Sequence, residues 1–210
     1  MLTEGLERLG IVVPAEVETR ALAFLDEMLR WNQHINLTAI KDRTEATEVH
    51  LLDSLVLCRY LTGTESLLDM GSGAGLPGIV LAIAQPNLSV VSVESTGKKI
   101  NFQKHIKRRL KIDNLEIIQE RIEKLKTVLP NLPGFDVVTA RAFASMDKLL
   151  ELGMPWLKKR GRLLAMKGPE GHSELCQVRK LIDQKGWVVS LHEYQLPASG
   201  AERLLIVVEK

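Results

Sequence analysis

The sequence predicts an α/β protein in which a Rossmann-like, largely parallel sheet follows an N-terminal helical extension. Residues 1–62 carry apolar residues at helical spacing only, whereas from Ser66 on short Val/Ile/Leu runs alternate with helical patterns. Continuous apolar runs are typical of parallel strands that are buried on both faces. A glycine-rich turn directly after the first run adds the junction at which such sheets bind ligands. We therefore expect a helical cap over residues 1–62 and a core over residues 63–210 that form one compact unit.

The helical cap is predicted to contain three helices. A short apolar stripe ends at Gly10, a longer helix opens at Pro14, and a third helix covers about residues 44–60. His50 and Asp53 lie three residues apart in the third helix, hence on one face. Two interpretations stay open for this pair. One is a structural hydrogen bond between helix and core, which the sequence favours slightly, and the other is a place in a functional site.

The core is predicted to hold seven strands, the last of them antiparallel. The first six strands cover about residues 67–70, 90–93, 115–118, 137–140, 162–166 and 188–192, and helices cover about 77–84, 97–111, 121–127, 145–156 and 172–185. The last apolar run, within residues 202–210, follows the sixth strand after about ten residues. That gap is too short for a helical crossover, so this strand is expected to be antiparallel.

Composition excludes several classes of protein. The chain has 28 Lys and Arg against 26 Asp and Glu, and its formal net charge of +2 is too small to indicate a polyanionic partner by itself. Cys58 and Cys176 are far apart and form no cluster with histidines, so no metal site is expected. No apolar run approaches the roughly 20 residues that span a bilayer. We expect a cytoplasmic protein with reduced thiols.

The glycine-rich turn runs from Asp69 through Gly71, Gly73 and Gly75 to Leu76. Glycine permits backbone conformations that other residues avoid and lets a ligand approach the main chain. A dinucleotide-binding turn requires glycine at the sixth position of G-x-G-x-x-G, where this chain has Leu76, so that fingerprint fails. The pattern D-x-G-x-G-x-G resembles instead the first motif of S-adenosylmethionine-dependent methyltransferases. In that motif the carboxylate, here Asp69, lies near the methionine ammonium of the cofactor.

A second carboxylate, Glu94, directly follows the next predicted strand. Its two acceptor oxygens suit the two ribose hydroxyls of an adenosyl group. The alternative is a solvated loop acid or a partner of the next helix N-terminus. The glycine turn that precedes it in the chain favours the ribose contact.

The helix after Glu94 is strongly basic, with no acid between Lys98 and Lys111. Such a face can neutralise several RNA phosphates, each contributing to salt-dependent binding. The alternative is a solvated face that acids elsewhere in the chain balance. We favour contact with nucleic acid, through Lys98, Lys99, Lys104, Lys107, Arg108 and Arg109.

Two cations follow the fourth and fifth predicted strands. Arg141 ends the fourth strand and Lys167 ends the fifth, flanked by Ala142 and Gly168. Side chains at the ends of adjacent central strands share one cleft, so a role in a pocket is favoured over ordinary surface ion pairs. The Asn/Asp-Pro-Pro-Tyr/Phe motif of enzymes that methylate exocyclic amines is missing there, and no strand ends in a nucleophilic cysteine.

Together these residues resemble the 16S ribosomal RNA guanine-N7 methyltransferases, also called the glucose-inhibited division protein B family. The resemblance covers nearly the whole chain. It rests on Trp31-Asn32 with Asn36-Leu37-Thr38, His50 with Asp53-Ser54, Asp69 to Gly78, Gly97-Lys98-Lys99, Arg121-Ile122-Glu123, Phe135-Asp136, Arg141-Ala142 and Lys167-Gly168. It implies cofactor contacts at Gly71, Leu76, Ile122, Glu123 and Arg141, with Glu94 on the ribose. Ala74 stands where the family often has proline, and Met70 where it usually has valine or isoleucine.

The resemblance implies transfer of a methyl group from S-adenosylmethionine to N7 of one guanosine in small-subunit (16S) ribosomal RNA, either free or within a small-subunit particle. Arg141 and Lys167 are candidates to hold guanine O6 or a phosphate, and Asn36 to orient the base or close the pocket. No general base is expected, because N7 loses no proton. We expect a monomer. Two rival functions are a nicotinamide-dependent oxidoreductase, disfavoured by Leu76, and a non-catalytic ribosome-assembly factor, disfavoured by the intact glycine turn.

Overall fold

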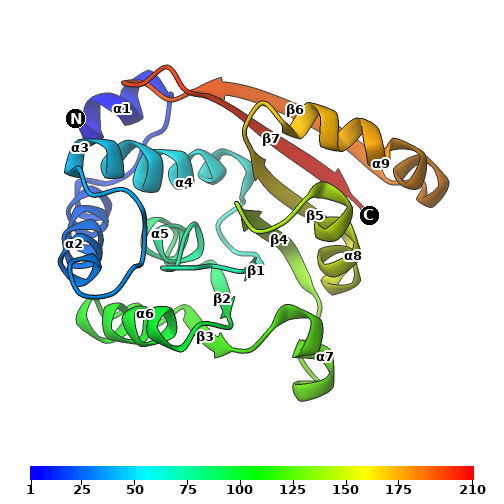
Figure 1. Cartoon of the computed structure of the whole chain (residues 1–210), viewed down its shortest axis with the longest axis horizontal. Helices are drawn as coiled ribbons and strands as arrows, with labels where there is room; N and C mark the ends of the chain where they lie inside the picture. Colours follow the sequence, from blue (N-terminus) through cyan, green and yellow to red (C-terminus); the bar gives the residue numbers. More distant parts are fainter.

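A seven-stranded sheet with helices on both faces forms the protein, and the computed structural model describes all residues, 1–210 (Figure 1). The strand order is β3-β2-β1-β4-β5-β7-β6. The strands from β3 to β5 in this order are mutually parallel, and β7 is antiparallel to both of its neighbours, which confirms the predicted last strand. The strands are β1 (Ser66–Met70), β2 (Ser89–Glu94), β3 (Leu115–Gln119), β4 (Phe135–Arg141), β5 (Leu157–Lys167), β6 (Val188–Gln195) and β7 (Glu202–Glu209).

Helices precede the sheet and fill the connections between its strands. They are α1 (Leu2–Arg8), α2 (Ala15–Asn32), α3 (Arg43–Ala46), α4 (Asp53–Leu55), α5 (Gly78–Ala84), α6 (Gly97–Arg109), α7 (Leu125–Val128), α8 (Met146–Gly153) and α9 (Gly171–Lys185). A π-helix, η1 (Thr47–Leu52), and the 3-10 segments η2 (Val56–Tyr60), η3 (Ile122–Lys124) and η4 (Met154–Trp156) complete the set. None of the helices combines the length and apolar character that crossing a bilayer demands.

Successive side chains of the parallel strands enter two different apolar cores. Leu67 of β1 belongs to a cluster of 34 buried residues on one face, and Leu68 to a cluster of 23 on the other. This alternation is the period of two that a strand imposes, and burial on both faces explains the unbroken apolar runs. Helices α7, α8 and α9 cover the smaller core, whereas α5, α6 and the cap cover the larger one.

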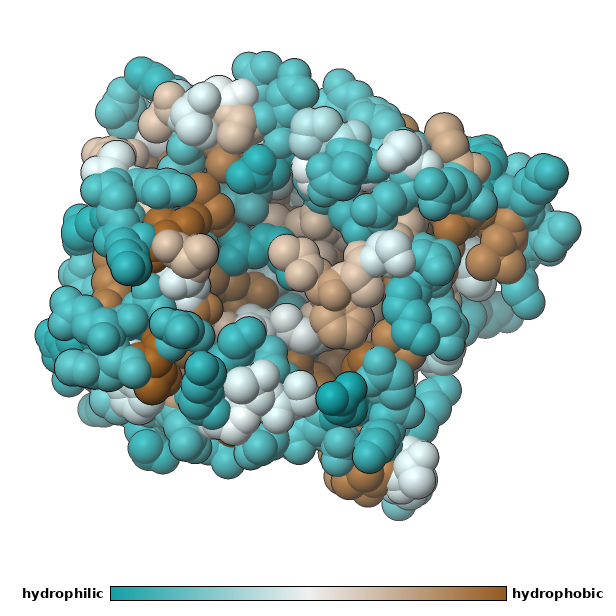
Figure 2. All heavy atoms as spheres, viewed as in Figure 1, coloured by the Kyte–Doolittle hydropathy of each residue, from teal (hydrophilic) through white to brown (hydrophobic).

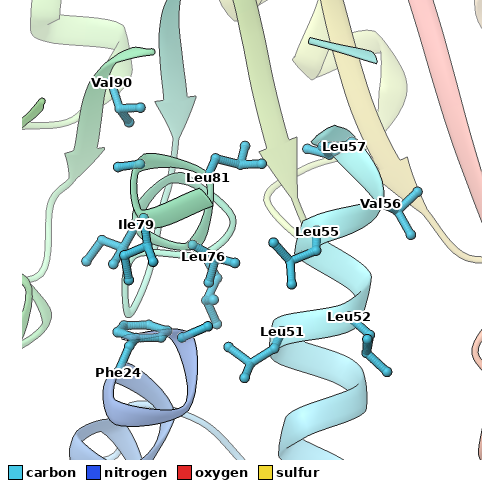
Figure 3. Packing of buried hydrophobic residues seen from close by; sticks show 14 of the residues in the cluster. Phe24, Leu51, Leu52, Leu55, Val56, Leu57, Leu76, Ile79, Leu81 and Val90 are labelled. Atoms are coloured by element: carbon cyan, nitrogen blue, oxygen red, sulfur yellow. The ribbon is translucent and has the colours of Figure 1, made fainter. Parts of the chain in front are cut away.

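The helical cap shares its core with the sheet. Phe24 of α2 and Leu51 of η1 are fully buried and lie next to Leu76 and Ile79, at the start of α5 (Figure 3). The same cluster continues into β1. Burying a large aliphatic or aromatic side chain contributes about 1.5–3 kcal/mol, so this contact docks the cap firmly. Residues 1–62 therefore have no separate core of their own.

The third cap helix is not uniform, although the sequence predicts one regular helix over residues 44–60. It begins as α3, widens to the π-helix η1, returns to α-helix in α4 and tightens to 3-10 in η2. Two backbone carbonyls of this segment accept hydrogen bonds from side chains. Ser54 Oγ donates to His50 O (2.6 Å), and Arg141 donates to Val49 O (2.6 Å). π-turns of this kind recur at functional sites.

Strand β5 is longer than predicted. It begins at Leu157, five residues before the predicted start at Arg162, and its register with β4 shifts between Phe135 and Val137. The extra residues, Lys158 to Gly161, bulge out of the ladder, and the polar ones among them are exposed rather than buried between neighbouring strands. The apolar pattern that predicts a strand is therefore missing there. The strand ends that matter for function, at Met70, Glu94, Arg141 and Lys167, lie as predicted at one edge of the sheet.

Candidate active site

Two cavities open side by side at the carboxyl ends of the parallel strands, where this face of the molecule is hollowed around apolar side chains (Figure 2). The β2-side cavity has a volume of about 280 Å³ and is lined by Gly71, Val93, Glu94, Ser95, Lys99, Glu120, Arg121, Ile122, Glu123, Ala142 and Phe143. The β5-side cavity has a volume of about 640 Å³ and is lined by Val49, His50, Asp53, Arg141, Ala142, Phe143, Ala144, Met166, Lys167, Gly168, Glu170, Glu174 and Arg203. Ala142 and Phe143 form a wall common to both cavities.

The turn after β1 requires its glycines. Gly71 has a φ of +65°, and a Cβ there would lie 2.1 Å from Cδ2 of Phe143. Gly75 has a φ of +95°, and a Cβ there would lie 2.3 Å from Cδ1 of Ile79. Gly73 also has a positive φ, of +58°, but its nearest neighbour is Lys99 Nζ at 3.9 Å. The turn is thus packed at both ends and open in the middle, where a ligand can approach the backbone.

Asp69 is a fully buried carboxyl at the end of β1 with one oxygen unused. Its Oδ2 accepts the N–H of Gly78 (2.8 Å) at the start of α5, whereas Oδ1 has no hydrogen-bond partner. Burial raises the pKa of Asp69 to about 7, against the opposing effects of the Gly78 hydrogen bond and the Arg141 charge. A buried acceptor without a partner costs free energy, so this carboxyl is prepared for a cationic donor such as an ammonium group.

Glu94 is held in a fixed orientation at the end of β2. Its two oxygens accept the N–H groups of Gly73 (3.0 Å) and Thr96 (2.8 Å). Burial opposes the ionised form, but these hydrogen bonds and the charge of Lys99 keep the pKa of Glu94 below its ordinary value. The carboxylate therefore stays ionised and faces the β2-side cavity with acceptor capacity left for hydroxyl donors.

The remaining predicted cofactor residues divide between the cavity and the core. Ile122 and Glu123 line the β2-side cavity beyond β3, beside Lys99, which the basic run predicts to contact RNA. Leu76 instead packs into the larger apolar core and lines neither cavity. Its N–H donates to Ser72 O (2.8 Å), so it closes the glycine turn from inside.

Arg141 lies in the β5-side cavity with its guanidinium tied to the cap. Nη1 donates to Val49 O (2.6 Å) and lies 3.4 Å from Asp53 Oδ2, while Nη2 lies 3.5 Å from His50 Nδ1. The side chain is 16% exposed, so part of the guanidinium still faces the cavity. Thus π-helix η1 and α4 fix the direction of the cation that ends β4.

His50 and Asp53 form the buried network that supports Arg141. His50 Nε2 lies 3.0 Å from Thr38 Oγ1, and Asp53 Oδ1 accepts the hydroxyl of Tyr194 (2.8 Å). Burial, reinforced by the Arg141 charge, lowers the pKa of His50 to about 4. The structural hydrogen bonds that the sequence favoured are present, and both residues also line the β5-side cavity. His50 is neutral near pH 7.

Lys167 is equally fixed. Its Nζ donates to Ala144 O (2.6 Å) and to Glu174 Oε2 (2.8 Å), and its side chain is only 8% exposed. Glu174 belongs to α9, and the same Oε2 also accepts the N–H of Met146 (2.7 Å). Arg141 and Lys167 thus line one cavity, as expected from their places at adjacent strand ends.

Asn36 lies apart from these residues. It is exposed in a separate cavity of about 520 Å³ between α2 and α3, together with Gln33 and Lys41. Its neighbour Asn32 closes the loop by accepting the N–H of Leu37 (2.8 Å). The structure therefore does not bring Asn36 to Arg141 and Lys167, and its predicted role in orienting the base stays a prediction.

The basic helix α6 presents only part of its charge freely. Arg109 Nε lies 2.9 Å from Oε1 of the buried Glu27, and His105 Nε2 lies 3.1 Å from Oε2 of the same carboxylate. Arg109 is thereby paired with a carboxylate of α2, and its predicted contact with RNA stays a prediction. Five cations of the helix have no acidic partner within ion-pair distance: Lys98, Lys99, Lys104, Lys107 and Arg108.

Sequence reasoning missed several residues of the site. Phe143 separates the two cavities, and the Ala142 before it has a φ of +48° that turns the chain there. Tyr194 and Arg203 reach Asp53 from β6 and β7, at 2.8 and 3.6 Å. Phe143 lies two residues after Arg141, so a local signal in the sequence marks it. Tyr194 and Arg203 carry no local signal, because only the antiparallel end of the sheet brings them to the cap.

The order of the sheet, the glycine turn, the unpartnered oxygen of Asp69 and the carboxylate of Glu94 together define an S-adenosylmethionine-dependent methyltransferase. A family described as rRNA small subunit methyltransferase G matches residues 18–202. The chain belongs to this family.

Curated relatives are similar over the full length. The ribosomal RNA small subunit methyltransferase G of Syntrophotalea carbinolica is 48% identical over 210 residues, covering 100% of this chain and 96% of the relative. The protein of the same name from Geobacter sulfurreducens is 38% identical, covering 99% of this chain and 95% of the relative.

Solved structures share the fold at low sequence identity. An O-methyltransferase from Bacillus cereus in complex with SAH matches with a TM-score of 0.68 at 15% identity, covering 100% of each chain. An rRNA methylase from Streptococcus thermophilus matches with a TM-score of 0.56 at 18% identity, covering 73% of this chain and 91% of the other. These two structures support the methyltransferase fold of the sheet.

Proposed function

We propose that this protein transfers the methyl group of S-adenosylmethionine to N7 of a guanosine in small-subunit ribosomal RNA. The observation that carries the proposal is the pair of cavities that meet at Ala142 and Phe143. One contains carboxylates suited to the cofactor, and the other is walled by the fixed cations Arg141 and Lys167. A methyl donor in the first cavity and a base in the second would meet at this common wall.

The residues of the β2-side cavity fit the cofactor. Asp69, which is fully buried and not part of the cavity lining, would offer its unpartnered Oδ1 to the methionine ammonium, and Glu94 in the lining would accept from the ribose hydroxyls. Ile122 and Glu123 would border the adenine. When bound, S-adenosylmethionine supplies a strongly electrophilic methyl group, so the protein mainly has to align it with the nucleophile.

The residues of the β5-side cavity suit a nucleophile that loses no proton. Guanine N7 carries a free lone pair, and the neighbouring O6 is an acceptor. Lys167 can donate to O6, and Arg141 contributes a fixed positive charge beside it without touching N7. An arginine cannot serve as a base, and His50, whose pKa is lowered to about 4 by burial and the Arg141 charge, is only a weak proton acceptor.

RNA would approach over the face that joins the cavities to α6. The partner-free cations Lys98, Lys104, Lys107 and Arg108 would contact its phosphates. We place the reaction in the cytoplasm and take the active form to be a monomer, because one chain supplies both cavities. The substrate is ribosomal RNA, free or in a small-subunit particle.

Methyl transfer from labelled cofactor tests the proposal directly. Small-subunit particles and free RNA that lack the modification are incubated with the protein, digested to nucleosides and analysed by mass spectrometry. We expect 7-methylguanosine with the wild type and none with Asp69→Asn, a substitution of equal volume that lowers cofactor affinity. Label in another nucleoside, or in none, would overturn the assignment.

The absence of a general base predicts a pH profile. With cofactor and RNA saturating, the single-turnover rate should stay nearly constant from about pH 6 to 8.5, the range in which an ordinary histidine titrates. His50 does not titrate there because its pKa is lowered to about 4. A tenfold rise with pH that disappears in His50→Gln would show that a base takes part.

A further inference from the structure

We propose that Glu174, held against Lys167, accepts the N1–H of the target guanine and so selects guanine over other purines. This inference rests on the proposed function and deepens it. Lys167 and Glu174 would form one reading unit, in which the lysine recognises O6 and the glutamate recognises the neighbouring N1–H. No local sequence pattern predicts the pair, because the residues come from β5 and α9.

The first argument is the unused hydrogen-bonding capacity of the pair. A lysine ammonium has three donors, and Lys167 spends one on Ala144 O and one on Glu174 Oε2. Glu174 uses the same Oε2 for Lys167 and for the N–H of Met146, while its Oε1 has no partner in the protein. One donor and one acceptor therefore remain side by side, and both residues line the β5-side cavity.

The second argument is the place of the pair relative to the cofactor. The strand order puts β4 between β1 and β5, so the wall of Ala142 and Phe143 lies between the β2-side cavity and Lys167. A guanine that presents N7 to this wall directs the rest of its edge away from it, toward the end of β5. O6 follows N7 on that edge and N1–H follows O6, in the same order as the lysine donor and the glutamate acceptor.

The third argument is chemical selectivity. Guanine offers an acceptor at O6 and a donor at N1, whereas adenine offers a donor at N6 and an acceptor at N1. With adenine both contacts would be reversed, because the ammonium would face an amino group and the carboxylate would face a lone pair. Lys167 is 8% and Glu174 22% exposed, so water cannot readily satisfy groups that are mismatched there. Sites built to hydrogen-bond one partner reject its mismatched analogue strongly.

Glu170 is a matched comparison on the same wall. It also lines the β5-side cavity, and its Oε1 accepts the N–H of Gly168 (3.0 Å). It is exposed and has no hydrogen bond or ion pair with Lys167, so it lacks the fixed position beside the donor. Glu170→Gln therefore changes the charge of the same cavity without changing the proposed reading unit.

The test compares two RNAs that differ only at the methylated position, which holds guanine or 2,6-diaminopurine. The analogue keeps the shape and N7 of guanine but reverses the polarity at positions 6 and 1. The single-turnover rate is measured on both RNAs for wild type, Glu174→Gln and Glu170→Gln. Glutamine keeps the volume of glutamate and its oxygen can still accept from Lys167, while its amino group can donate to the N1 of the analogue.

We expect the wild type to prefer guanine by about a hundredfold or more, and Glu174→Gln to reduce this preference by about tenfold, the discrimination typical of one reversed base contact. Glu170→Gln should keep the preference of the wild type. A merely structural role would lower the rates on both RNAs equally and leave the preference unchanged, which would overturn the inference. If the wild type forms no 7-methylguanosine even in the guanine RNA, the proposed function itself is wrong.

Discussion

Replacing Gly71 by alanine should separate backbone strain from the close approach that the site needs. At a φ of +65° an alanine costs roughly 1–2 kcal/mol relative to glycine. Its Cβ would also lie 2.1 Å from Cδ2 of Phe143, against an ordinary carbon contact of about 3.5 Å. The Phe143 ring, which is part of the wall between the two cavities, must therefore move by about 1.4 Å.

Gly10 supplies the matched control, because it has a φ of +64° and a Cβ added there would meet no atom within 4 Å. Backbone strain should cost both variants about 1–2 kcal/mol of unfolding free energy in urea denaturation, and displacement of the Phe143 ring adds to this loss in Gly71→Ala only. Only Gly71→Ala should also weaken S-adenosylmethionine binding in calorimetric titration, by about tenfold or more, which corresponds to about 1.4 kcal/mol. Equal cofactor affinity in the two variants would refute the role of Phe143 and Gly71 in shaping the site.

Three further predictions concern the cap, the basic helix and acid stability. Glu27→Gln should lower the free energy of unfolding in urea by about 1–2 kcal/mol, since the buried carboxylate loses its ion pairs with Arg30 and Arg109 and its contact with His105. The exposed Glu16→Gln of the same helix should change little. Replacing Lys104 and Lys107 by glutamine should reduce the slope of log affinity for RNA against log salt by about 1.4, because each lost single-strand contact contributes about 0.7. Cofactor affinity should not change. An unaltered slope would mean that this face of α6 is only solvated and does not contact RNA. Burial opposes ionisation of Glu48, but backbone hydrogen bonds at the tip of the β6–β7 hairpin hold its pKa below the ordinary 4.5. Its stabilisation is therefore present above pH 4.5 and is lost as the pH falls through the lower pKa of the folded protein, so acid unfolding followed by circular dichroism should be less steep in Glu48→Gln.

Much of the fold could be predicted because burial on both faces leaves a local signature. A parallel strand with helices on each side must be apolar at every position, and Leu67 and Leu68 enter opposite cores for that reason. The turn after Asp69 is equally local, since its glycines adopt positive φ or accept close neighbours. The residues that end strands, Glu94 and Arg141, follow from the same regularity.

The rest of the site depends on contacts that no local sequence pattern predicts. Nothing near Glu174 indicates that Lys167 donates to it, because α9 is directed over the end of β5 by packing. No local pattern predicts the π-helix at Val49 either, because the Val49 carbonyl accepts its hydrogen bond from Arg141, 92 residues later. Glu27 likewise forms its ion pair with Arg109 only when α2 packs on α6, so one cation of the basic helix that is unpaired in the sequence pattern is paired in the structure.

The hairpin at the end of the chain holds the partners of two buried acids near its beginning. Glu48 accepts the N–H groups of Ala198 and Ser199, the first 150 residues later, and Asp53 accepts the hydroxyl of Tyr194, 141 residues later. During synthesis the cap therefore leaves the ribosome long before these acids have donors, and burying them unpaired is unfavourable. Full docking of the cap therefore needs the last hairpin, and we expect a chain that stops short of it to expose its first sixty residues to chaperones and proteases more often.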